Sequence, residues 1–318
     1  MELHEIRGLT DRIRDNVAQV IVGKEEAVEL ILIALITGGH VLLEDVPGTG
    51  KTLLAKTIAR SLDCSFKRVQ FTPDLLPSDI SGINFFNQKS GEFEFRAGPL
   101  FAHILLADEI NRATPRTQSS LLEAMEERQV SVDGDTRALP DPFLVIATQN
   151  PVENQGTFPL PEAQLDRFLL KLAMGYPSTE EGVELLIRFK EQNPLASVRP
   201  VADRSQLVAA GQAYSRVRVS EDLLRYLVEI AEKTRIHPEL SLGVSPRGTQ
   251  ALLRSAQALA VIRGRDYVLP DDIKKLVKPV FAHRLVFRNR MNGQAGGADR
   301  ILDRIVADTV VPAETGIH

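Results

Sequence analysis

Residues 41–59 constrain the fold more than any other part of the sequence. The apolar residues 41–43 predict a short buried strand, and residues 53–59 predict a helix. Between them, residues 44–52 read Glu-Asp-Val-Pro-Gly-Thr-Gly-Lys-Thr. Glycines at such a strand-to-helix turn let backbone N–H groups surround phosphate oxygens, and the dipole of the following helix favours negative charge there. The sequence therefore predicts a phosphate-binding loop.

The residue types in this loop predict how a nucleotide would bind. Lys51 is expected to contact the β- and γ-phosphates, and the Thr52 hydroxyl to contact Mg²⁺. Asp45 replaces the first glycine of the strict Gly-x-x-x-x-Gly-Lys-Thr pattern. We expect the loop to form nevertheless, because aspartate tolerates left-handed and turn conformations better than most residues. The residues predicted to bind the nucleotide here are Pro47, Gly48, Thr49, Gly50, Lys51, Thr52 and Leu53.

Length, charge and cysteine content limit the class of protein. A chain of 318 residues exceeds one comfortable core, which favours two domains. The net charge of −4, without a basic stripe, disfavours a nucleic-acid partner. Cys64 is the only cysteine, so no disulfide framework is expected. No signal peptide is evident, and the apolar run at residues 30–36 is too short to span a bilayer, so we expect a soluble cytoplasmic protein.

Strand and helix patterns alternate from the phosphate loop to about residue 172, which predicts an α/β fold with a mostly parallel sheet covered by helices. We place this domain at residues 1–175. It contains two predicted β-hairpins, at residues 83–95 and 129–136. The first hairpin is either an exposed excursion or a loop aimed at a partner or a central pore. Helical patterns alone follow in residues 178–288, and residues 289–318 read as a flexible link and a last helix.

Polar residues follow two of the predicted buried strands. Asp108 and Glu109 come after the apolar residues 104–107, and Asn150 follows residues 143–148. Because α/β sheets bind ligands at the carboxyl ends of their strands, we expect these side chains to meet the phosphate loop. Asp108 would hold Mg²⁺, and Glu109 would polarise the attacking water as a general base. Asn150 would bond the water or the γ-phosphate, although an Asn-Pro pair is also an ordinary turn.

Three arginines are candidates for contact with the nucleotide. Arg167 precedes a predicted strand, where it cannot easily reach its own nucleotide but can reach a neighbouring subunit's γ-phosphate. The alternative is a local ion pair with Asp166 or Glu162, and Arg112 is a rival for the same role. Arg247 lies in the first turn of a predicted helix, an unfavourable place for a cation that suggests an anion nearby, for which ATP is a candidate.

Taken together, five segments resemble, in order and spacing, the motif series of the MoxR-type AAA+ ATPases. They are residues 44–52, 107–113, 147–151, 156–168 and 245–247. The resemblance implies an AAA+ P-loop ATPase domain with an all-helical lid, and both hairpins fit the branch that carries an insert in its second helix. It implies ATP and Mg²⁺ as cofactors, with Lys51, Thr52 and Asp108 serving them and Glu109 as the catalytic residue.

The same resemblance assigns further roles. Asn150 matches sensor 1, Arg167 the arginine finger and Arg247 sensor 2, while Val22 and Gly23 match the segment that lines the adenine pocket. It also implies a homo-oligomeric ring, expected to be a hexamer. MoxR-type proteins are thought to act as chaperones that mature or activate other proteins, often with a von Willebrand factor A-type partner.

Two other functions stay open at this point. A nucleic-acid motor needs a cationic pore, but the hairpins carry both signs of charge. Their basic residues are Lys89, Arg96, Arg128 and Arg137, and their acidic residues are Glu92, Glu94, Asp133 and Asp135. The ATPase subunit of a metal chelatase shares many of the motifs, although no metal or porphyrin site is legible. A scaffold that binds nucleotide without hydrolysis is disfavoured, because Lys51, Asp108 and Glu109 are all present.

Overall fold

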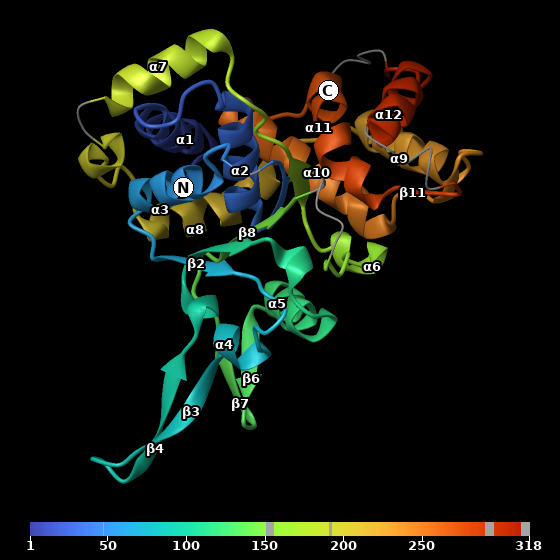
Figure 1. Cartoon of the computed structure of the whole chain (residues 1–318). Helices are drawn as coiled ribbons and strands as arrows, with labels where there is room; N and C mark the ends of the chain where they lie inside the picture. Colours follow the sequence, from blue (N-terminus) through green and yellow to red (C-terminus); the bar gives the residue numbers. More distant parts are fainter. Residues whose placement is uncertain (47, 151–155, 191–192, 290–295, 313–318) are drawn as a thin grey trace.

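The fold is built on a five-stranded parallel sheet (Figure 1). The computed structural model describes residues 1–46, 48–150, 156–190, 193–289 and 296–312. Neighbouring strands run parallel in the order β2-β5-β8-β1-β9. Their bounds are β1 (Val41–Glu44), β2 (Phe66–Gln70), β5 (Ile104–Asp108), β8 (Leu144–Gln149) and β9 (Leu170–Leu172). The predicted α/β fold with a parallel sheet is therefore confirmed.

Each face of the sheet packs into its own hydrophobic core, because successive side chains of a strand point to opposite faces. On one face, Val41 and Leu43 pack among α1 (Leu3–Ala18), α2 (Glu25–Thr37) and α3 (Lys51–Ser61). On the other face, Leu42 packs with α5 (Pro115–Glu127). The interior strand β5 is buried along its whole length, as its continuous apolar run predicted. The two layers hold the carboxyl ends of the strands in fixed positions.

Both predicted hairpins are present. They are formed by β3 (Gly82–Asn87) with β4 (Glu92–Ala97) and by β6 (Gln129–Val132) with β7 (Asp135–Ala138). The short helix α4 (Pro77–Ser81) precedes the first hairpin. Both hairpins point away from the body of the protein on the same side, and the first reaches furthest (Figure 1). Asn84 and Asp133 join them through a hydrogen bond of 2.9 Å.

The rest of the chain is mainly helical. The helices are α6 (Glu162–Leu165), α7 (Thr179–Phe189), α8 (Arg204–Ala213), α9 (Glu221–Arg235), α10 (Pro246–Ile262), α11 (Pro270–Phe281) and α12 (Gly297–Ala307). Short 3₁₀ turns lie at Pro99–Phe101, Ile110–Arg112, Pro194–Ser197, Tyr214–Arg216 and Ala282–Arg284. No helix in the described parts of the chain is long and apolar enough to cross a membrane.

A two-stranded antiparallel pair within this helical part was not predicted. It joins β10 (Leu240–Leu242) and β11 (Val286–Phe287), which are too short to show an alternating pattern in the sequence. Residues 290–295 of the predicted flexible link lie outside the described residues. The domain boundaries at residues 175 and 288 stay predictions.

Candidate active site

Three adjacent strands bring the predicted catalytic residues to one edge of the sheet. The phosphate loop follows β1, Asp108 ends β5, and Asn150 comes directly after β8, which lies between them. All three strands are parallel, so their carboxyl ends lie side by side. Lys51 and Thr52 are the first two residues of α3, which leaves from the same edge. The structure therefore brings five predicted residues to the same edge of the sheet: Lys51, Thr52, Asp108, Glu109 and Asn150.

The phosphate loop is open in the way that a bound anion requires. Gly48 and Gly50 adopt φ values of 87° and 90°, and a Cβ at either position would meet no atom within 4 Å. Gly50 is the N-cap of α3, so the free N–H groups of that helix begin here. Lys51 Nζ lies 3.0 Å from the carbonyl oxygen of Asp45 and 3.2 Å from that of Val46. This cradle fits the phosphates of a nucleotide.

The other predicted members of the loop are placed as follows. Thr49 is half-buried, as are Thr52 and Leu53 in the first turn of α3. Pro47 lies outside the described residues. The loop thus offers a hydroxyl, an ammonium group and backbone N–H groups within one helical turn.

Asp45 does not use the left-handed conformation that we expected aspartate to tolerate at this position. Its buried carboxylate instead accepts three backbone hydrogen bonds, from the N–H groups of Val46, Met174 and Gly175 at 2.9, 3.0 and 3.0 Å. The sequence carried no sign of this, because two of the donors lie about 130 residues away.

Asp108 and Glu109 are held by contacts from both neighbouring strands. Arg68 on β2 donates to Asp108 Oδ2 from Nη2 and Nε at 2.7 and 3.0 Å. Thr148 on β8 donates its hydroxyl to Asp108 Oδ1 and accepts the N–H of Glu109 at 2.9 Å. Glu109 itself has φ 56°, a left-handed conformation that is uncommon for a residue with a side chain and is typical of functional sites.

The carboxylate of Glu109 has two side-chain partners. Gln70 Nε2 lies 2.6 Å and Arg112 Nε 2.9 Å from Glu109 Oε2. Gln70 pairs in register with Asp108 at the carboxyl ends of β2 and β5. Sequence reasoning missed Arg68, Gln70 and Thr148. Their polar side chains near the ends of two predicted strands could have marked them as neighbours of the acidic pair. The structure places Arg112 beside the acidic pair of its own chain.

Oxygen ligands for a magnesium ion are available at this edge. Thr52 offers a hydroxyl and Asp108 a carboxylate, and Mg²⁺ prefers such oxygen ligands with several waters and substrate phosphates. Over the described ranges, no group of three or more histidine, cysteine, aspartate or glutamate side chains could hold a metal ion. The residues present therefore fit a metal that is bound largely through the nucleotide.

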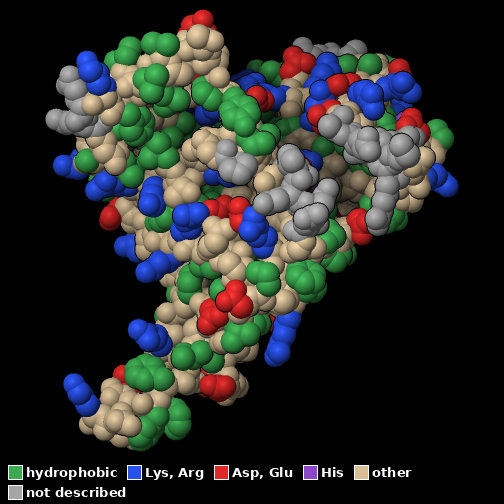
Figure 2. Space-filling view, viewed as in Figure 1, with side chains coloured by type: hydrophobic (Ala, Val, Ile, Leu, Met, Phe, Trp, Pro, Cys, Tyr) green, Lys and Arg blue, Asp and Glu red, His purple; other side chains and the backbone are tan. Residues whose placement is uncertain are grey.

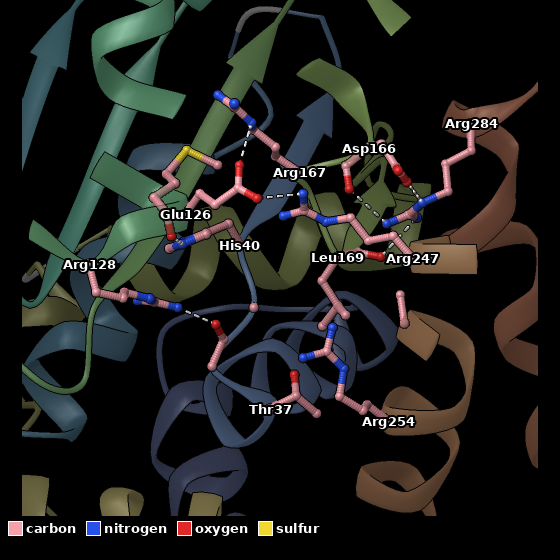
Figure 3. Close-up of a pocket in the computed structure, with 14 residues that line it drawn as sticks. Thr37, His40, Glu126, Arg128, Asp166, Arg167, Leu169, Arg247, Arg254 and Arg284 are labelled. Carbon is pink, nitrogen blue, oxygen red and sulfur yellow. Dashed lines mark hydrogen bonds and ion pairs between the residues drawn. The ribbon is translucent and has the colours of Figure 1, made fainter. Parts of the chain in front are cut away.

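Arg167 and Arg247 lie together, but not at this edge. Both bind the carboxylate of Glu126 on α5 (Figure 3): Arg167 Nε lies 2.9 Å from Oε2, and Arg247 Nη1 lies 2.8 Å from Oε1. The local partners that we considered for Arg167 were Asp166 and Glu162. Asp166 instead contacts Arg284 and Ser245, at 2.6 and 2.8 Å, in the same region. The anion beside Arg247 is thus a carboxylate of its own chain.

The two arginines lie at the amino edge of the sheet. Arg167 comes shortly before β9, and the N–H of Leu169 bonds the carbonyl of His40, which directly precedes β1. The phosphate loop follows the other end of β1. Four strand residues at ~3.3 Å each separate the edges by roughly 13 Å before the loops are counted. Neither arginine reaches the phosphate loop of its own chain in this arrangement.

The surroundings of this arginine pair are strongly cationic. A cavity of about 190 Å³ is lined by Arg128, Arg167, Arg247, Arg254 and Arg284 together with Glu126 and Asp166. His40, at its base, lies buried against Met125, and burial and Arg128 lower its pKa to about 3. His40 is therefore neutral. It accepts the N–H of Val145 at Nδ1, which leaves the Nε2 proton for the carbonyl of Met125.

Val22 and Gly23 lie between α1 and α2. Val22 is buried, and Gly23 has φ 66° with its Cα packed so closely on α7 that a Cβ would lie 1.9 Å from Glu181 Oε1. Gly23 lines a cavity of about 1090 Å³ together with Glu44 and Met174. Since Glu44 ends β1 and Met174 contacts Asp45, this cavity opens next to the phosphate loop.

Comparisons with known proteins agree with this geometry. Residues 40–170 match the model of the ATPase family associated with various cellular activities, and residues 232–305 match the AAA lid domain. The Bacillus subtilis protein YeaC is 48% identical over 98% of this chain and 97% of its own length. The Mycobacterium tuberculosis protein named chaperone MoxR1 is 41% identical over 93% of this chain and 81% of its own. A crystal structure of a Cytophaga hutchinsonii protein, 38% identical, superposes with a TM-score of 0.91 over 97% of this chain and 96% of its own.

Proposed function

Because the chain belongs to the MoxR-type family of AAA+ ATPases, we propose that it hydrolyses ATP with Mg²⁺ at the contacts between subunits of a hexameric ring and thereby remodels protein clients. One observation carries the proposal. The phosphate loop and acidic pair lie at the carboxyl edge of the sheet, whereas Arg167 and Arg247 share Glu126 at the amino edge. A complete site therefore needs two chains.

At the carboxyl edge, Lys51 would bind the β- and γ-phosphates, and Thr52 and Asp108 would hold Mg²⁺. The metal would neutralise charge on the phosphates and fix their orientation. Glu109 orients the attacking water and accepts its proton, with its backbone fixed through Thr148. Asn150, after β8, contacts the water or the γ-phosphate. The support for these roles is the common edge on which the residues lie.

From the next subunit, Arg167 and Arg247 would contact the γ-phosphate. Guanidinium groups stabilise the charge that builds up on the phosphoryl oxygens in the transition state. Glu126 presents both guanidinium groups from one carboxylate, which supports their joint action. Arg112 is less suited to act across a subunit contact, because it pairs with Glu109 of its own chain.

The base of the nucleotide would lie by Val22 and Gly23. The large cavity beside Gly23 and Met174 supports this position, since it adjoins the phosphate loop. The close packing of Gly23 on Glu181 would place α7 near the base as well. The other loop residues, from Pro47 to Leu53, would surround the phosphates.

A protein client fits the first hairpin better than nucleic acid does. Phe86 and Phe93 are 52% and 76% exposed, and their rings lie 5.4 Å apart on the projecting arm. Hydrophobic side chains gather near the end of this arm (Figure 2). Exposed apolar groups of this kind mark protein contacts. The name of the relative MoxR1 as a chaperone agrees with such a client, for which a von Willebrand factor A-type domain is a candidate.

The test of ATP hydrolysis compares three variants of the assembled protein. Glu109→Gln should lower kcat by roughly 100-fold to 10,000-fold while ATP still binds, because it removes the general base. Lys51→Ala should weaken ATP binding itself. Glu123→Gln, which changes an exposed carboxylate elsewhere on α5, should leave turnover unchanged. Undiminished turnover in Glu109→Gln or Lys51→Ala would refute the assignment of the site.

The same Glu109→Gln variant tests the client class, because it holds ATP without cleaving it. We expect it to retain protein clients in a pull-down with ATP, and to lose them when Phe86 and Phe93 are both changed to serine. A parallel titration with single-stranded and duplex DNA, at low and moderate salt, tests the nucleic-acid motor. Tight DNA binding that persists at moderate salt, with no dependence on the two phenylalanines, would favour that alternative.

A further inference from the structure

Asp45 makes a connection that a glycine at its position would lack. Its side chain is 7% exposed, and its two oxygens divide their contacts. Oδ1 accepts the N–H of Val46, within the phosphate loop, at 2.9 Å. Oδ2 accepts the N–H groups of Met174 and Gly175, both at 3.0 Å. Hydrogen bonds to an ionised carboxylate are roughly twice as strong as neutral ones, so the phosphate loop is firmly attached to residues 174 and 175.

The segment attached in this way is the chain's exit from the sheet. Residues 173–178, which we call the exit segment, run from the end of β9 to Ser178, the N-cap of α7. Gly175 has φ 64°, and a Cβ there would meet no atom within 4 Å. The carbonyl of Tyr176 accepts a hydrogen bond from Lys24 Nζ at 3.3 Å. The exit segment is thus bonded to the phosphate loop at one end and to the start of α2 further on.

Asp45 also contacts Lys51, the residue proposed to bind the phosphates. Its carbonyl oxygen accepts a hydrogen bond from Lys51 Nζ at 3.0 Å. The main chain of Asp45 therefore contacts Lys51, while its side chain holds the exit segment. A nucleotide phosphate that drew Lys51 Nζ to itself would remove one contact of Asp45, the residue that also holds Met174 and Gly175.

From these contacts we propose that Asp45 is a positioning residue that couples the phosphate loop to the exit segment, so that nucleotide binding changes how firmly residues 174 and 175 are held. The proposal rests on the proposed function only in taking the ligand to be an adenine nucleotide. Glycine at this position would satisfy the phosphate loop but leave the exit segment without its acceptor.

Amide hydrogen exchange of the full chain tests this, with and without ADP, in wild type, Asp45→Gly and Asp45→Asn. In Asp45→Gly, the amides of Met174 and Gly175 should exchange at least about tenfold faster, because both acceptor contacts are lost. The difference between the ADP-bound and ADP-free protein at the amide of Gly175, which does not line the cavity proposed for the base, should disappear. The apparent Kd for ADP should stay within about threefold of wild type, since the phosphate-binding N–H groups remain. Asp45→Asn keeps one carbonyl oxygen and should lie between the two.

Glu123→Gln is the control. Glu123 is an exposed carboxylate on α5 that lines neither the cavity proposed for the base nor the surroundings of Asp45. We expect the exchange at Met174 and Gly175 in this variant, and its response to ADP, to equal those of wild type. Wild-type exchange and response to ADP in Asp45→Gly, or in Asp45→Asn should the first variant not fold, would overturn the proposal.

This outcome is separate from the fate of the proposed function. Turnover that survives Lys51→Ala would refute ATP hydrolysis at this site, whereas the exchange measurement reads the exit segment directly. A coupling role also predicts a split in the kinetics. For Asp45→Gly, kcat should fall by about fivefold or more while KM for ATP changes little; a purely local effect on the phosphate loop would raise KM instead.

Discussion

Mixing two inactive variants tests whether Arg167 serves a neighbouring chain. Lys51→Ala removes a group at the carboxyl edge, and Arg167→Ala removes one at the amino edge. Each variant alone should lose turnover by roughly 1000-fold or more, because a phosphate-binding lysine or an arginine finger is missing from every site. Since the two edges lie roughly 13 Å apart, we expect that no single chain supplies both groups to one nucleotide.

The recovery expected on mixing follows from how the two residues are distributed. In an equal, random mixture, about half of the sites have a chain that carries Lys51, namely the Arg167→Ala chain. About half of those sites face a neighbour that carries Arg167, so about one quarter of all sites are complete. We therefore expect the mixture to recover about a quarter of wild-type turnover if each site acts independently.

The assay is steady-state phosphate release at a protein concentration at which the chains are assembled, after subunits have exchanged. A mixture of Lys51→Ala with the double variant Lys51→Ala/Arg167→Ala is the negative control, because it contains no complete site. Arg225→Ala, which changes an exposed arginine on α9, should behave like wild type. Recovery below a few per cent in a mixture that demonstrably co-assembles would refute the placement of Arg167 at its neighbour's nucleotide.

Three further predictions concern single side chains. Gln70→Ala should raise turnover roughly twofold to tenfold without changing ATP affinity, because the lost hydrogen bond of 2.6 Å holds the Glu109 carboxylate on Gln70 instead of on the attacking water; unchanged or lower kcat would contradict this. Burial lowers the pKa of His40 from 6.5 to about 3. The contribution of neutral His40 to the free energy of unfolding is therefore fully present above pH 6.5 and falls as the pH drops towards 3. Urea unfolding should show that, between pH 7 and pH 5, the free energy of unfolding of His40→Gln falls by about 2 kcal/mol less than that of wild type. Burial raises the pKa of Cys64 from 9.0 to about 11. Labelling of Cys64 by a disulfide reagent at pH 8 should therefore be about 100 times slower than labelling of a free thiol. Labelling at the rate of a free thiol would contradict this prediction.

Much of the fold could be predicted from local pattern. The central strands are apolar runs, and the hairpins have turn residues such as Gly91 and Gly134 between short strands. The order of motifs along the chain then places Asp108 and Asn150 near the phosphate loop, because parallel strands share a carboxyl edge. These predictions needed only the periodicity of nearby residues.

Partners that lie far apart in the sequence could not be predicted in the same way. Arg247 bonds Glu126 across 121 residues, and nothing in a single sequence marks that carboxylate among the many on exposed helix faces. Asp45 looked like a tolerated variation, although its buried carboxylate holds amides about 130 residues away. The pair β10–β11 was missed because strands of three and two residues have no measurable period.

The placement of Arg167 and the phosphate loop at opposite edges restricts the symmetry of any assembly that uses both. A dimer with a two-fold axis joins the same surface of each chain, so it would bring two arginine edges or two loop edges together and complete no site. The contact must instead run head to tail, and such contacts continue until a rotation closes them. An open row of chains would always leave its last phosphate loop without an arginine, so only closure makes every copy active.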